Sequence, residues 1–189
     1  MLCDPVSYTD RPSILSSTSL QEGTLTLLHV ETDMDMPFIF ESLKKESAKN
    51  WDIQPLLDNF KKSFSYIAGS HTSQAFIVKL NGLPIFEIEA HEGPKHAPLH
   101  SGFQAVDGDY FIILIAGHFD QAAFSVYINS LQLCLEYFFG YPEVKRIIAP
   151  VYDGSDKEQR AQLLIQAGLK GFLEKTTPTE PDLFAIYRP

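Results

Sequence analysis

Several features that would point to a metal, membrane or nucleic-acid function are scarce or absent in this sequence. The two cysteines, Cys3 and Cys134, lie far apart and form no metal-binding motif. Lys and Arg number 15 against 24 Asp and Glu, so the formal net charge is −9. Nucleic-acid binding requires a concentrated basic surface, and this balance argues against it.

Long apolar runs are also missing. No stretch of about 18 apolar residues occurs, so we expect no membrane-spanning segment and no membrane partner. The residues from Met1 to Pro5 lack the basic start and apolar core of a secretory signal. Without an export signal, a disulfide between two distant cysteines is not expected either. Together these absences predict a cytoplasmic protein.

What is present suits one globular domain. The chain has 189 residues, of which 44% are hydrophobic, 12% aromatic and 21% charged, enough apolar mass for a core. Residues 1–22 are rich in Ser, Thr, Pro and Asp and have no sustained period, which predicts an irregular N-terminal arm. The domain itself is then expected over residues 23–189.

Apolar periodicity and turn signals predict the elements of that domain. Asn81-Gly82 stands between two apolar runs and favours a type I′ hairpin turn, since both positions take positive φ. Asp35 is expected to cap a helix with Pro37 in its first turn, and Ser155 to Glu158 reads as a capping box. The expected strands cover 24–30, 75–80, 83–89, 109–116, 144–150 and 183–187, and the expected helices cover 35–51, 53–67, 124–139 and 155–167.

This order predicts the fold class. A meander followed by a βαβ-like half indicates an α/β domain with a mixed, mostly antiparallel central sheet and helices on both faces. Strand alternation places Glu87 and Glu89 on one face of their strand, where either carboxylate faces an acceptor pocket or water. The loop after them carries His91, His96 and His100 without helical spacing, so a zinc site is not expected.

Several segments resemble one family. Trp51 follows the first helical region, and Asn81 to Glu89 matches the family hairpin that ends in glutamate. Asp109 to Gly117 matches an apolar strand that ends in a small residue and glycine, and Lys145 to Ile148 matches the next strand. In this element order the chain resembles the Gcn5-related N-acetyltransferases (GNAT), in particular the hydroxylysine and hydroxyornithine N-acyltransferases of siderophore biosynthesis.

The resemblance implies acetyl-CoA, or another acyl-CoA, as co-substrate. Its pantetheine arm would bind the backbone of the apolar strand at Ile113, Leu114 and Ile115, while its pyrophosphate would lie at the following helix N-terminus. The expected neighbours of the pyrophosphate are Gly117, Gln121, Ala122, Ala123 and Ser125. That loop has no glycine after Gly117, and the aspartate beyond the next strand follows Ala149-Pro150 in place of a Glu-Pro pair.

The resemblance also assigns the acceptor side. A histidine eight or nine residues before Asp109 is the family's catalytic candidate, which makes His100 the expected general base, assisted by Asp153. Glu89 takes the place of the family glutamate, and Glu87, His96 and Trp51 complete the expected substrate-binding set. A structural role in loops, turns or a solvated strand face is the alternative for each of these residues.

The sequence therefore predicts an acyl-CoA-dependent N-acyltransferase that transfers an acetyl or succinyl group to a small N-hydroxylated diamine or amino acid. One alternative is another small-amine N-acetyltransferase. The other is a binding protein of the same fold without turnover, which the glycine-poor loop favours. Oligomeric state is left open, with a homodimer among the alternatives.

Overall fold

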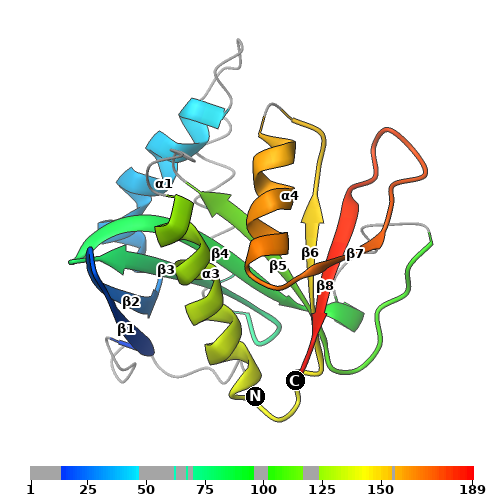
Figure 1. Cartoon of the computed structure of the whole chain (residues 1–189), viewed down its shortest axis with the longest axis horizontal. Coiled ribbons are helices and arrows are strands. Elements are labelled where there is room, and N and C mark those ends of the chain that lie inside the picture. Colours follow the sequence, from blue (N-terminus) through cyan, green and yellow to red (C-terminus); the bar gives the residue numbers. More distant parts are fainter. Residues whose placement is uncertain are drawn as a thin grey trace. The chain divides into compact units, whose positions relative to one another are not determined.

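The computed structural model describes residues 14–46, 62, 67, 70–95, 102–116, 124–154 and 156–189. Eight strands form one mixed sheet in the order β1-β2-β3-β4-β5-β6-β8-β7 (Figure 1). The chain divides into two compact units. We call the described residues 14–89 with 114–116 the N-terminal unit, and 90–113 with 124–189 the C-terminal unit.

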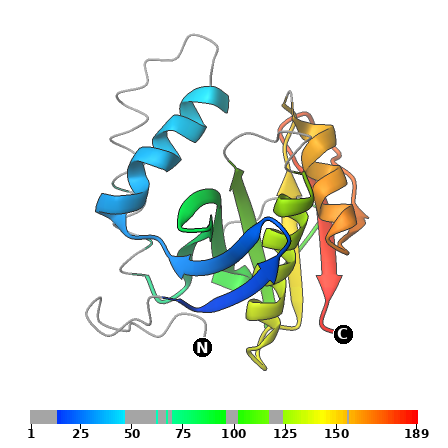
Figure 2. The same ribbon diagram turned by 60° about the vertical axis from the view of Figure 1, so that its left-hand side comes forward.

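The N-terminal unit begins with a hairpin that the sequence did not predict. Residues 16–20, expected to be irregular, form strand β1 and pair antiparallel with β2, as the blue hairpin of Figure 2 shows. β1 carries mostly Ser and Thr, so its sequence has little of the apolar alternation that predicts a strand. Pairing with β2 stabilises β1 as a strand. The elements of this unit are β1 (Ser16–Leu20), β2 (Gly23–His29), α1 (Thr32–Glu46), β3 (Ser73–Leu80) and β4 (Leu83–Glu92), which continues into the other unit.

Helix α1 begins three residues earlier than expected. Asp35 does not lie before the helix, because its carboxylate accepts the backbone N–H of Glu31 at 2.9 Å from within the first turn. The carbonyl of Glu31 in turn accepts the N–H groups of Met34 and Asp35. Pro37 consequently lies inside the helix. The buried side of α1 packs on β2 and β3 in a core of Val30, Met36, Ile39, Ile67, Ala75 and Ile77.

The Asn81-Gly82 hairpin is confirmed. Asn81 has a φ of 50° and Gly82 a φ of 84°, as a type I′ turn requires. The Asn81 side chain also joins the β1–β2 turn, since its Oδ1 accepts the N–H of Thr24 at 3.0 Å and its Nδ2 donates to the carbonyl of Glu22 at 3.2 Å. Gly23 leaves room for it, because a Cβ there would lie 2.2 Å from Asn81 Oδ1.

The C-terminal unit holds the other half of the sheet. β6 pairs antiparallel with β8 over its whole length. Its parallel pairing with β5 covers only its first three residues, Arg146 to Ile148. β7, a four-residue strand at the sheet edge that the sequence did not predict, pairs antiparallel with β8. The elements are η1 (Gly93–Lys95), β5 (Asp109–Ala116), α3 (Phe124–Phe139), β6 (Arg146–Val151), α4 (Lys157–Gln166), β7 (Lys170–Leu173) and β8 (Asp182–Tyr187).

The helices of the C-terminal unit are held at their ends. Arg188 donates to the carbonyl of Phe139, the last residue of α3, and to those of Tyr141 and Pro142 just beyond it. Carbonyls at the end of a helix lack partners within the helix. α4 packs against α3, β6 and β7, and Gly168, with a φ of 105°, ends it as expected. The N-cap of α4 is Asp156, without a side-chain cap bond, and Ser155 of the expected capping box lies outside the described residues.

Two further predictions concern the helix expected over residues 53–67 and the absence of a membrane-spanning segment. The helix over 53–67 lies outside the described residues apart from Lys62 and Ile67, both of which have helical backbone. In the part of the chain that the structure describes, no helix is long and apolar enough to cross a membrane.

Candidate functional site

The parallel ladder between β5 and β6 is short. Its register covers Asp109↔Arg146, Tyr110↔Ile147 and Phe111↔Ile148. β5 continues beyond Phe111, and β6 continues as Ala149-Pro150-Val151 against β8 alone. Among the described residues, no ladder pair therefore joins Ile112 or Ile113 to β6.

Pro150 fits this arrangement. Proline cannot donate a ladder hydrogen bond, so it is disfavoured in a strand with a neighbour on each side. Here Pro150 lies two residues beyond the last register pair with β5. Proline at position 150 is thus compatible with the second half of β6, which has a register with β8 and none with β5.

The closed end of this ladder is built around Arg146. Its guanidinium donates to both Asp109 oxygens, from Nε at 2.8 Å and from Nη2 at 2.6 Å, and to the Tyr187 hydroxyl at 3.2 Å. Cζ of Arg146 lies 5.1 Å from the ring centroids of Phe103 and Phe172 and 5.5 Å from that of Tyr187. Such cation–π contacts and a bidentate ion pair fix the strands at this end.

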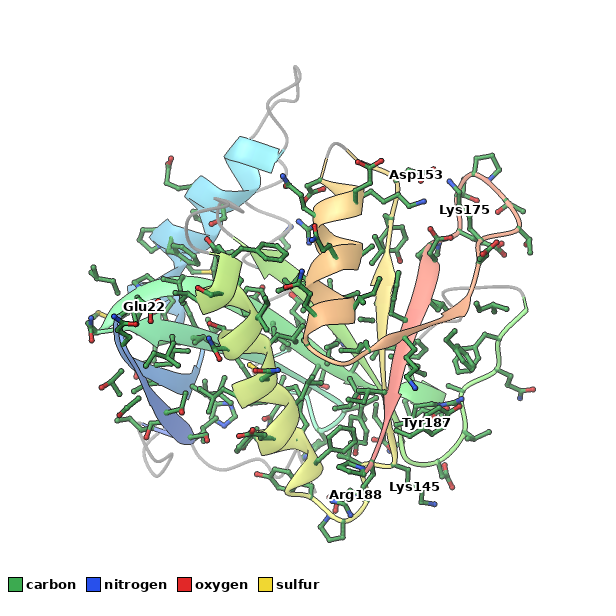
Figure 3. All side chains as sticks on the ribbon, viewed as in Figure 1. Glu22, Lys145, Asp153, Lys175, Tyr187 and Arg188 are labelled. Carbon is green, nitrogen blue, oxygen red and sulfur yellow. The ribbon has the colours of Figure 1, made fainter. Side chains whose placement is uncertain are left out.

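A network of charged side chains lies at the C-terminal end of β6, beyond the ladder with β5. Lys157 Nζ lies 3.0 Å from Asp153 Oδ1 and 2.7 Å from Asp182 Oδ2, and Lys175 Nζ contacts Asp153 Oδ2. Asp182 Oδ1 also accepts the backbone N–H of Lys175 at 2.9 Å. Figure 3 shows Asp153 and Lys175 at the opposite end of the C-terminal unit from Tyr187 and Arg188.

These contacts shift the titration of the network. Hydrogen bonds from Lys175 and then Lys157 lower the pKa of Asp153, whose side chain is 50% exposed. Lys157 and the backbone of Lys175 lower the pKa of Asp182, and the same pairing raises the pKa of Lys157. Asp153 is therefore ionised at neutral pH and is a weak proton acceptor.

A cavity of about 580 Å³ adjoins this network. Its polar walls include Lys175 and Asp182, and its apolar walls include Phe172 and Phe184. The remaining lining residues in the described chain are Gly171, Leu173, Glu174 and Leu183. All of them come from β7, β8 or the segments that adjoin these strands.

The two predicted glutamates of β4 differ in their environment. Glu87 is 0% exposed, and neither carboxylate oxygen has a hydrogen-bond partner among the described residues. Burial, and secondly the charge of Glu89, raises the pKa of Glu87 well above its ordinary range. Burial therefore favours the neutral acid form of Glu87, whereas Glu89 is only partly buried.

The coenzyme residues expected on described elements lie on β5 and α3. Leu114 is buried and Ile113 half-buried in β5, and Ile115 belongs to the same strand. Ser125 is exposed in the first turn of α3, where its backbone carbonyl accepts Asn129 Nδ2 at 2.8 Å. The other expected coenzyme residues, Gly117, Gln121, Ala122 and Ala123, lie outside the described residues, as do His96, His100 and Trp51.

The sequence singled out Asp153 as a candidate residue but none of the charged residues that contact it. Lys157, Lys175 and Asp182 converge because α4, β7 and β8 meet at the end of β6, and no local motif marks them. His91 is buried in β4. Within the described ranges, no group of three His, Cys, Asp or Glu side chains is placed to hold a metal ion.

No family model and no curated protein sequence matches the chain. Solved structures do. An uncharacterized protein from Bacillus halodurans is 16% identical with a TM-score of 0.69, over 92% of this chain and 91% of that one. Aminoglycoside acetyltransferase AAC(6')-Ib in complex with coenzyme A and kanamycin is 20% identical with a TM-score of 0.69, over 87% and 95%. Mycobacterium smegmatis RimJ in complex with CoA-disulfide is 13% identical with a TM-score of 0.63, over 90% and 85%.

Proposed function

Because this chain has the fold of the Gcn5-related N-acetyltransferases, we propose that it is an acyl-CoA-dependent N-acyltransferase acting on a small amine. The observation that carries the proposal is the end of the β5–β6 ladder at Phe111↔Ile148. Beyond this pair, the described residues of β5 and β6 form no further ladder pair with each other, and an extended ligand could pair with β5 there. Similar structures that contain coenzyme A support the same activity.

The coenzyme side of the proposal rests on β5 and the start of α3. Backbone N–H and C=O groups of Ile113, Leu114 and Ile115 are suited to the amide groups of a pantetheine arm, which bind in the manner of an added strand. A helix N-terminus attracts the pyrophosphate through its free N–H groups. The residues proposed for this second contact are Gly117, Gln121, Ala122, Ala123 and Ser125.

The acceptor side rests on an acid–base group and a carboxylate. In the proposed reaction, the acceptor nitrogen attacks the thioester carbonyl, the C–N bond forms and the C–S bond breaks. His100 takes the proton that the nitrogen loses and returns a proton to the leaving thiolate, so that the reaction has no net uptake or release of protons. Asp153 assists His100 by its negative charge, which its lowered pKa maintains.

Glu89 is the proposed contact for the acceptor's polar end, and Trp51 and His96 are proposed as further substrate-binding residues. Glu87 belongs to the same proposed set, but as a neutral acid it would offer a hydrogen bond rather than a charge. An N-hydroxylated amine suits these groups, since a hydroxylamine nitrogen is largely unprotonated at neutral pH and needs little help from a base. We therefore propose hydroxamate formation for siderophore assembly as the specific reaction, ahead of acetylation of another small amine.

A binding protein without turnover is the second candidate. Both Asp153 oxygens are engaged by lysines, which limits the carboxylate as a catalytic partner, and the loop before α3 is poor in glycine. Calorimetric titration with acetyl-CoA decides between the candidates first. Micromolar binding is expected of an enzyme, and no heat at millimolar coenzyme would exclude acyl transfer.

Turnover is tested by release of the coenzyme thiol. The assay compares three N-hydroxylated acceptors, N-hydroxylysine, N-hydroxyornithine and N-hydroxycadaverine, with unmodified lysine. Mass spectrometry of the product identifies the acylated nitrogen. We expect release with the N-hydroxylated acceptors. Coenzyme binding without release on any acceptor would support the binding protein instead.

A further inference from the structure

We propose that the cavity lined by residues 171–175 and 182–184 binds the carboxylate end of the acceptor, so that the substrate is an N-hydroxylated amino acid rather than a diamine. The inference rests on the proposed function, which leaves both acceptor classes open. It starts from the placement of Lys175, which lines the cavity and contacts Asp153.

Lys175 has hydrogen-bonding capacity to spare. Its ammonium carries three N–H donors, and within the described chain only Asp153 Oδ2 engages it. Its side chain is 30% exposed, so the remaining donors are accessible. A carboxylate that enters the cavity would form charge-assisted hydrogen bonds with this ammonium.

The neighbouring carboxylates do not compete strongly for that ammonium. Asp182 has one oxygen on Lys157 and the other on a backbone N–H. Asp153 shares its two oxygens between Lys157 and Lys175. Two lysines therefore balance these two aspartates, and Glu174, which is exposed, is the one further acidic residue among those that line the cavity in the described chain.

The rest of the cavity suits the body of an amino acid. A volume of about 580 Å³ falls within the range of roughly 300–1,000 Å³ usual for small-molecule pockets. Phe172, Leu173 and Phe184 supply apolar walls for a methylene chain. A buried aliphatic chain with one anionic end is the ligand that this combination favours.

Position connects the cavity with the proposed chemistry. Asp153 follows the end of β6 that lies beyond the β5 ladder, and it touches Lys175 directly. The carboxylate site would therefore lie beside the proposed catalytic carboxylate, and the cavity would share one wall, Phe172, with the Arg146 cluster. An extended acceptor could reach from Lys175 toward the reacting nitrogen.

The test compares N-hydroxylysine with N-hydroxycadaverine, which differ only by the α-carboxylate. In the wild-type enzyme we expect a lower KM for N-hydroxylysine. In Lys175→Met we expect the KM for N-hydroxylysine to rise by about tenfold or more, the size of a lost charge-assisted contact, and the KM for N-hydroxycadaverine to stay within about twofold. Lys175→Arg should recover part of the loss, and Lys170→Met, a change at an exposed lysine of β7, should have no effect.

Equal changes for both acceptors in Lys175→Met would overturn the inference, because a structural role of the Lys175–Asp153 pair affects both alike. A wild-type preference for N-hydroxycadaverine would overturn it as well. Calorimetry of N-hydroxylysine with the coenzyme-free protein keeps the two proposals separate. If acetyl-CoA does not bind but N-hydroxylysine binds in a Lys175-dependent manner, the acyltransferase proposal fails and the carboxylate site stands.

Discussion

The guanidinium of Arg146 and the carboxylate of Asp109 form a bidentate ion pair across the first register pair of the β5–β6 ladder, at 2.8 and 2.6 Å. Their side chains are only 13% and 3% exposed. The pair thus fixes the two strands just before they cease to pair. Rings from three other segments surround the guanidinium, so the charge has no easy alternative partner.

Asp109→Asn should therefore be strongly destabilising. Removal of one partner leaves a largely buried charge uncompensated, at a cost of about 3–5 kcal/mol. Thermal unfolding should show a Tm lowered by roughly 10 °C. Asp107→Asn, an exposed neighbour, is the matched control and should leave Tm almost unchanged. Equal Tm values for wild type and Asp109→Asn would mean that the ion pair does not fix the strands.

Glu87 should make stability fall as pH rises. Its folded pKa is raised above the ordinary 4.5, so the folded state binds a proton that the unfolded state has released. Stability is then full below about pH 4.5 and declines toward the raised pKa. Urea unfolding from pH 4 to 8 should show this slope, and Glu87→Gln should reduce it.

Glu87→Leu should go further and stabilise the protein by about 1–3 kcal/mol, because it removes a buried polar group without a partner. Glu92→Gln, on the same strand but paired with exposed Lys95, should change little. A loss of stability in Glu87→Leu would show that the carboxyl group is satisfied in solution.

Asn81 should contribute through both its backbone and its side chain. Asn81→Ala loses two hydrogen bonds and places a less tolerant residue at positive φ, so we expect a loss of about 1–2 kcal/mol. Asn81→Gly keeps the turn conformation and should lose less. Chemical denaturation of the two variants separates the contribution of the backbone conformation from that of the side-chain hydrogen bonds. Equal losses of stability in both variants would mean that the side-chain hydrogen bonds alone account for the loss.

His100→Ala should lower kcat by at least about tenfold, since a positioned acid–base group contributes that much or more. His96→Ala should have a smaller effect, and exposed His71→Ala should have none. Thiol release at saturating acetyl-CoA measures each variant. Full activity in His100→Ala would remove this residue from the mechanism.

Cys134 should be inert in the folded protein. It is fully buried in α3, and burial raises the pKa of its thiol, so little reactive thiolate forms. In a Cys3→Ser background, a thiol reagent should label the protein only after denaturation. Rapid labelling under native conditions would show that α3 opens readily. An inert Cys134 also leaves thiol-release assays free of background from this residue.

Local signals predicted much of the fold. Local residue preferences determine the conformation of the Asn81-Gly82 turn and of the apolar run in β5. Both elements occur where expected. β1 and β7 were missed because each is a short edge strand with one neighbour. β1 carries mainly Ser and Thr, and β7 includes Gly171, so pairing rather than residue preference forms them.

The candidate site was less predictable for a related reason. Asp153 could be found from its place after β6, but Lys175 lies 22 residues further along the chain. The antiparallel register of β6, β8 and β7 brings the two together. The pKa of Glu87 likewise depends on complete burial, which alternation along β4 does not predict.

Gly23 and Asn81 also constrain how this sequence can diverge. The absent side chain of one residue is the space that the other occupies, although 57 positions separate Asn81 from Thr24, the residue beside Gly23. A side chain at position 23 would clash with Asn81 and would also be strained by the φ of 140° there, so a smaller residue at position 81 would relieve only the clash. Among homologous sequences, glycine should therefore persist at position 23 even where residue 81 varies.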